Sequence, residues 1–143
     1  MNPDLAAQRA LDRLAKNGFD ALTEADKTLA TAWLFDAGVG NNGFARYFAS
    51  KRGNLAFHAP AALRKIGATQ LAKIAAEANA VFGPDGPPRD HKARQTLVRG
   101  FEKATHSTLE ALEQRYYASS EDIDELLEAF LTRDQTIQSK TQR

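Results

Sequence analysis

Four carboxylates near the carboxyl end of the chain have a spacing that could do chemistry together. Glu121, Asp124, Glu125 and Glu128 stand at positions i, i+3, i+4 and i+7. On a helix this spacing places them along one exposed edge, with roughly 5–6 Å between neighbours. Such a row imitates the phosphates of a nucleic-acid backbone and would bind a basic protein surface. The alternative is an ordinary solvated face whose acids favour the positive end of the helix dipole.

Basic residues form a second candidate set in the middle of the chain. The net charge is +6 over residues 51–100 and −4 over residues 101–143, although the whole chain carries only +1. A nucleic-acid-associated domain would use Arg64, Lys65, Arg94 and Arg99. Against this hypothesis, no nucleic-acid-binding motif is present, and aromatic residues do not alternate with these charges as a stacking platform requires. A solvated surface is the simpler interpretation.

A third set surrounds a run of glycine and asparagine at residues 38–43. Glycine adopts positive φ at no cost and asparagine tolerates it, so this run predicts a sharp bend. A short helix capped by Asn41 or Asn42 should follow, with aromatic residues on one inward face. The alternative is a small-ligand or enzymatic pocket. The motif consists of Asn41, Asn42, Gly43, Phe44, Arg46, Tyr47 and Phe48, and the pocket would use Asn41, Asn42, Arg46 and Tyr47.

The remaining residue types give no support for catalysis. His58, His91 and His106 are not spaced as metal ligands, and the chain has no cysteine. Phosphate-binding glycine loops and nucleophile motifs are also missing from the sequence. We therefore expect no catalytic residue, no metal and no cofactor, and we expect that the protein is not an enzyme.

Helical spacing of apolar residues runs through the chain, and sustained strand-like alternation does not occur. The expected fold is all-α, a single compact domain of about six to eight helices over residues 1–134. Residues 135–143 are expected to form a poorly ordered tail. The expected helix caps are Thr23, Thr69, Asp90, and Ser119 or Ser120. Pro60 should begin a helix and Gly67 end it, and residues 51–54 and 83–89 should form an exposed turn and a loop. Residues 90–118 form either one helix, or two with a break near His106.

Composition favours an ordinary globular chain. Apolar residues make up 43% and charged residues 26% of the sequence, which argues against a disordered or membrane-spanning class. The lack of cysteine fits a reducing compartment. We expect a cytoplasmic protein that does not bind membranes.

Three motifs together resemble a known family. They are Asn41-Asn42-Gly43-Phe44-Ala45-Arg46-Tyr47-Phe48, Ala62-Leu63-Arg64-Lys65-Ile66-Gly67-Ala68 and Leu112-Glu113-Gln114-Arg115-Tyr116-Tyr117. Their order is similar to that of a bacterial domain family of unknown function typified by a DNA-mimic protein. The resemblance implies an all-helical fold that often self-associates. It also implies an acidic surface that imitates the DNA backbone and occupies a transcription factor.

The carboxylate row and the resemblance favour the same function. We expect a non-enzymatic protein-interaction module, a regulator that binds a protein partner through Glu121, Asp124, Glu125 and Glu128. A homodimer is compatible with the resemblance. The nucleic-acid-associated domain and the pocket at residues 41–47 are the alternatives.

Overall fold

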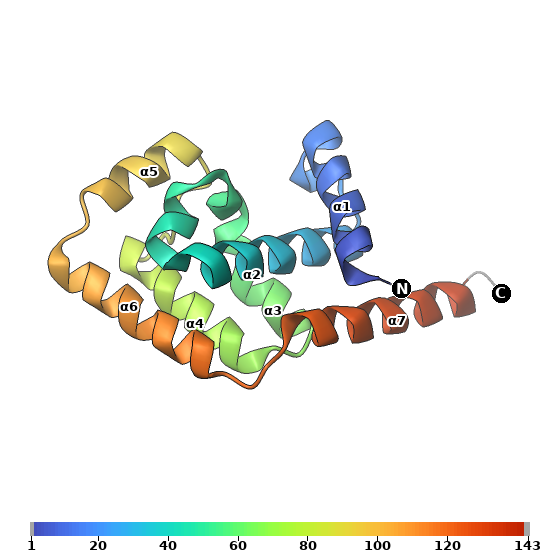
Figure 1. The fold of residues 1–143 in the computed structure, drawn as a ribbon. Coiled ribbons are helices and arrows are strands. Elements are labelled where there is room, and N and C mark those ends of the chain that lie inside the picture. Colours follow the sequence, from blue (N-terminus) through green and yellow to red (C-terminus); the bar gives the residue numbers. More distant parts are fainter. Residues whose placement is uncertain (1, 142–143) are drawn as a thin grey trace.

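Helices joined by turns and loops make up the described fold (Figure 1). The computed structural model describes the backbone of residues 2–141 and the side chains of residues 2–134. No strand occurs in this range, which confirms the predicted all-α class in a single compact domain. The α-helices are α1 (Pro3–Asn17), α2 (Glu24–Ala49), α3 (Ala59–Lys65), α4 (Thr69–Asn79), α5 (His91–Arg99), α6 (Lys103–Ala118) and α7 (Ile123–Thr141). Three short 3-10 helices lie between them: η1 (Phe19–Ala21), η2 (Lys51–His58) and η3 (Ala80–Phe82).

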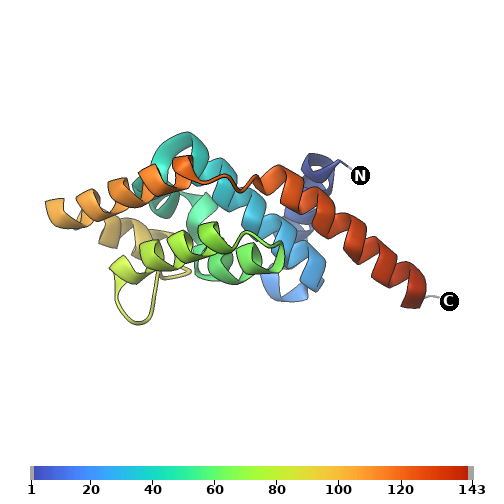
Figure 2. The ribbon, with the colours of Figure 1, turned by 90° about the horizontal axis from the view of Figure 1, so that it is seen from below.

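α2 is the central helix, and the other helices pack around it. α1 lies at one end of α2 and α5 at the other, while α6 and α7 follow one another along one side (Figure 1, Figure 2). α4 contacts both α3 and α6. This arrangement brings α7 against both α1 and α2, although α7 is far from them in the sequence.

The aromatic residues of α2 fill the centre of the core, as the sequence predicts. Phe44, Tyr47 and Phe48 are at most 1% exposed, and Phe35 from the preceding turns packs against the first two. Ring centroids in this group are separated by 5.4 to 6.0 Å in tilted, stacked and edge contacts. Such contacts stabilise a core beyond the burial of apolar area alone.

The sharp bend predicted for residues 38–43 is confirmed only at the last residue of that run, because α2 stays helical through Asn42 and kinks at Gly43. Gly43 has φ 81° and ψ 172°, a conformation that favours glycine. Gly38 serves packing instead, since a Cβ there would lie 2.4 Å from the Tyr47 ring. Glycine is therefore needed at position 38 to make room for the Tyr47 ring, and not to form a bend.

The cap that follows the kink comes from another helix. The Phe44 N–H donates to Glu113 Oε1 of α6 at 2.7 Å, so the predicted capping by Asn41 or Asn42 is wrong. A Cβ on Gly43 would lie 2.6 Å from the same carboxylate oxygen. Glycine is thus required both for the backbone conformation and for the approach of Glu113.

Other local expectations divide in the same way. The caps Thr23 and Asp90 are confirmed, because each accepts a hydrogen bond from the backbone N–H three residues later, at 3.1 and 2.9 Å. The turn predicted at 51–54 is the start of η2; its predicted exposure is confirmed for Lys51, Arg52 and Asn54, whereas Gly53 is buried. Residues 90–118 form two helices, but the break lies at 100–102 and not near His106. Residues 107–110, next to the predicted break, lie inside α6.

The carboxyl end of the described chain is helical. α7 runs to Thr141, while residues 142–143 and the side chains from 135 onward lie outside the description. The poorly ordered tail expected at residues 135–143 therefore stays a prediction. Among the described residues, no helix combines the length and the apolar character needed to cross a bilayer.

Candidate functional site

Three of the four predicted carboxylates lie together on α7. Asp124, Glu125 and Glu128 are exposed, whereas Ile123, Leu127 and Leu131 on the same helix are at most 5% exposed and join the core. None of the three carboxylates forms an ion pair within the part of the chain that the structure describes. We call Asp124, Glu125 and Glu128 the α7 acidic edge.

Glu121 does not belong to this edge, contrary to the expected row of four. α7 begins only at Ile123, because Asp122 caps it by accepting a hydrogen bond from the Glu125 N–H at 3.3 Å. The Glu121 carboxylate instead accepts hydrogen bonds from the backbone N–H groups of Gln70 and Leu71, at 3.1 and 2.8 Å. It therefore caps α4, in place of the predicted Thr69. The predicted cap of the last helix at Ser119 or Ser120 is also wrong, because Asp122 caps α7.

Acids from other elements extend the negative potential around Asp124. Burial, followed by the negative charges of Asp36, Asp4 and Asp122, raises the pKa of Asp124. Asp4 lies on α1 and Asp36 on α2, and both helices pack against α7. No periodic pattern in the sequence reveals this group, because its members come from different elements. Packing in three dimensions thus brings together acids that no single helix shows.

Asp36 is held by a tyrosine of the third sequence motif. The Tyr116 hydroxyl donates a hydrogen bond to Asp36 Oδ1, and burial is the main reason why the pKa of Asp36 is raised. Burial and the negative charge of Asp36 in turn raise the pKa of Tyr116, so the hydroxyl stays protonated and remains a donor. The neighbouring Tyr117 hydroxyl donates to the carbonyl oxygen of Gly40 at 3.1 Å. These bonds fix the end of α6 against α2 beside the acidic group.

The residues of the glycine-asparagine motif do not line any of the cavities described in the structure. Asn41, Asn42 and Arg46 are exposed, but Tyr47 is 1% exposed and faces the core. None of the described cavities is lined by these four residues. The alternative of a ligand or enzyme site at this motif therefore loses its geometric basis, and the structural interpretation of Phe44 and Phe48 is confirmed.

The basic residues of the nucleic-acid alternative do not share one surface either. Arg94 is 0% exposed. Its guanidinium donates to the carbonyl oxygens of Phe48, Ser50, Pro88 and Arg89 and to Asn54 Oδ1. Arg64 and Lys65 lie on α3, whereas Arg99 is exposed on α5. Arg94 is therefore a structural residue that joins α5 to η2 and the end of α2.

The histidines and acids show no arrangement typical of a catalytic or metal centre. Within the described residues, no group of three or more potential ligands is placed to hold a metal ion. His91 contacts the carbonyl oxygen of Ala49 at 2.9 Å, and His58 stacks on Phe19 with the ring centroids 4.3 Å apart. Both rings thus have packing roles.

The protein is thus an all-helical domain with an aromatic core and an exposed acidic edge on α7. Residues 20–134 match a family model described as DMP19-like protein, so the chain belongs to the DMP19-like protein family. The matched range runs from η1 into α7 and includes all three sequence motifs. The match confirms the resemblance to the DNA-mimic type. No curated protein and no solved structure gives a significant match to the chain.

Proposed function

We propose that the protein is a non-enzymatic interaction module that binds a basic protein surface through the α7 acidic edge. The observation that carries the proposal is the exposure of Asp124, Glu125 and Glu128 on one helix, without ion pairs to described residues. Membership of the DMP19-like family, a family of DNA mimics, supports the same function. The partner would be a DNA-binding protein of the cytoplasm, regulated because its DNA site is occupied.

The electrostatics of the edge favour recognition by charge. Asp4, Asp36 and Asp122 add to the negative potential at Asp124, and such a potential attracts a basic surface over a Debye length of about 8 Å at physiological salt. The overall net charge of +1 does not oppose this, because residues 101–143, which include α7, carry a net charge of −4, whereas residues 51–100 carry +6. Complementary fields of this kind raise association rates and select partners.

The test is capture of the partner from the native host with three forms of the protein. The wild type should retain a DNA-binding protein, and the double variant Glu125→Lys/Glu128→Lys should lose it. The matched control is Asp12→Lys/Asp85→Lys, which changes the net charge equally at two exposed acids outside α7. All three forms should melt at nearly the same temperature, since exposed substitutions usually change stability by less than about 0.5 kcal/mol.

Competition with duplex DNA makes the experiment specific for mimicry. Added DNA should release the captured protein, and rising salt should weaken capture. Capture that survives the Glu125→Lys/Glu128→Lys change would show that the α7 acidic edge is not the site. Capture that is indifferent to DNA would separate protein binding from DNA mimicry. Sedimentation of the wild type tests the predicted homodimer in the same preparation.

A further inference from the structure

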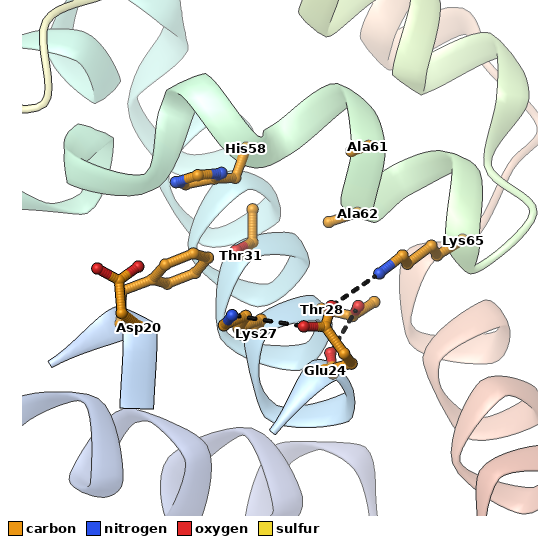
Figure 3. Close-up of a pocket in the computed structure, with 10 residues that line it drawn as sticks. Asp20, Glu24, Lys27, Thr28, Thr31, His58, Ala61, Ala62 and Lys65 are labelled. Carbon is orange, nitrogen blue, oxygen red and sulfur yellow. Dashed lines mark hydrogen bonds and ion pairs between the residues drawn. The ribbon is translucent and has the colours of Figure 1, made fainter. Parts of the chain in front are cut away.

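A second feature, which shares no residue with the α7 acidic edge, has the properties of a small-ligand site. A cavity of about 320 Å³ lies between η1, the first turns of α2, and α3 (Figure 3). This volume falls at the lower end of the range of roughly 300–1,000 Å³ that ligand cavities occupy. Its size suits a compound with a single ring.

One end of the cavity is cationic. Lys27 of α2 and Lys65 of α3 approach Glu24 from two sides, with Nζ to carboxylate distances of 3.4 and 3.2 Å (Figure 3). The Glu24 side chain is 75% exposed, and ion pairs this exposed contribute little to stability. An incoming carboxylate can therefore take the place of Glu24 between the two ammonium groups at small cost.

One residue of the cavity wall carries a polar atom without a partner among the described residues. Thr31 lines the cavity and is 1% exposed, yet its hydroxyl has no hydrogen-bond partner in the part of the chain that the structure describes. Figure 3 shows its side chain projecting from α2 toward His58. A buried hydroxyl left unpaired is unfavourable, and a polar atom of a ligand would satisfy it.

Alanines and two aromatic rings provide most of the remaining wall. Ala61 and Ala62 come from α3, and the stacked rings of Phe19 and His58 close the opposite side. Burial, together with the positive charge of Arg89, lowers the pKa of His58, so the ring is neutral at pH 7 and acts as an aromatic wall. Asp20 lies on the far side of the cavity from Lys65 (Figure 3). A second negative charge on the ligand would be repelled there.

We propose that this cavity binds a small organic monocarboxylate with an aromatic or apolar body. The carboxylate lies between Lys27 and Lys65, the body lies against Ala62 and the Phe19–His58 pair, and a polar atom of the ligand bonds the Thr31 hydroxyl. The site is distinct from the α7 acidic edge, so the inference does not depend on the proposed protein-binding function.

Benzoate is the probe that tests this proposal, with benzamide as its neutral counterpart. Titration followed by NMR should shift the Thr31 methyl and His58 ring resonances in a saturable way, with a Kd on the order of 1 mM, as expected of a ligand with few atoms. Benzamide should bind at least about tenfold more weakly, because it lacks the charge that the lysines recognise.

Two variants and one control identify the contacts. Lys65→Gln should weaken benzoate about tenfold, and Thr31→Val, which keeps the shape and removes the hydroxyl, about fivefold. Arg64→Gln removes the same charge from an exposed neighbour that does not line the cavity, and it should leave binding unchanged. Loss of affinity in both cavity variants but not in Arg64→Gln supports the proposal. Three results would overturn it: no saturable shift with benzoate, equal binding of benzamide, or unchanged affinity in both cavity variants.

Discussion

Arg94 and the α7 acidic edge are both charged, but their surroundings differ completely. The Arg94 guanidinium is buried, and it donates to five acceptors, of which four are backbone carbonyls and one is an asparagine side chain. Asp124, Glu125 and Glu128 are exposed and form no ion pair with the described residues. The Arg94 charge is therefore fully hydrogen-bonded inside the protein, whereas the charges of the α7 acidic edge are available to a partner.

This comparison teaches that the type and spacing of a charged residue do not decide its role. The number of internal hydrogen-bond partners decides it, because a fully bonded charge cannot recognise another molecule. Glu121 illustrates the point, since it neighbours the α7 acidic edge in sequence but caps α4. The predictions below test where the boundary between internal and available charges lies.

The largest effect is expected when Arg94 is changed to methionine. The substitution keeps an apolar stem but leaves five buried or half-buried acceptors without their donor. A buried acceptor left without its donor costs about 1–3 kcal/mol, so we expect the loss of several such bonds to lower the free energy of unfolding by about 3–5 kcal/mol, measured with urea. Arg94→Lys should be only partly tolerated, because an ammonium group cannot reproduce the planar fork of the guanidinium.

Arg99→Met is the control for Arg94→Met. Arg99 is exposed on the same helix, and its substitution should change the free energy of unfolding by less than about 0.5 kcal/mol. If both variants lose stability equally, then burial of Arg94 does not set its role, and the contrast with the α7 acidic edge fails.

A smaller effect should separate Glu121 from Glu125. Glu121→Ala removes the acceptor for two N–H groups at the start of α4 and should cost about 1–2 kcal/mol, as the loss of a helix cap does. Glu125→Ala, four residues later, should change stability by less than about 0.5 kcal/mol. Partner capture should show the opposite order, because only Glu125 belongs to the α7 acidic edge.

Equal stability of these two variants would contradict the assignment of Glu121 as a cap. Strong loss of partner capture in Glu121→Ala, with the fold intact, would place Glu121 in the binding surface after all. Circular dichroism on both variants before the capture experiment distinguishes these outcomes from simple unfolding.

Features encoded within one helix were predictable from the sequence, and features that join distant elements were not. The inward face of Phe44, Tyr47 and Phe48 follows from helical spacing, and the caps Thr23 and Asp90 follow from side chains adjacent to their own helices. The caps of the kink at Gly43 and of α4 come from Glu113 and Glu121, which lie 69 and 50–51 residues away. Local capping preferences cannot reveal such partners.

The acidic surroundings of Asp124 were hidden for a related reason. Asp4 and Asp36 approach Asp124 only because α1 and α2 pack against α7. The burial of Arg94 could not be predicted from the sequence either, because most of its acceptors are backbone carbonyl oxygens, and every residue carries one. The sequence thus predicts which face of a helix is inside, while the assembled fold determines which charges stay available.

Asp36 lies between the two extremes, and pH should reveal it. Burial raises the pKa of Asp36 above its ordinary value of 3.8 in the folded protein. Its contribution to stability is therefore fully present below pH 3.8 and is lost as the pH rises through the raised folded-state value. Asp36→Asn keeps an acceptor for the Tyr116 hydroxyl but removes the charge. Relative to the wild type, this variant should become progressively more stable as the pH rises from 4 to 7.

Urea unfolding of both proteins at several pH values measures this difference directly. Acids that do not interact with Asp36 affect both proteins alike, so subtracting the two curves isolates Asp36 together with its coupling to Asp124. A difference that does not change with pH would mean that the folded protein does not penalise this charge, and Asp36 would then belong with the available acids of α7. A stability difference that grows with pH would show that Asp36 is an internal residue, as Arg94 is. Asp36 nevertheless contributes to the negative potential at Asp124.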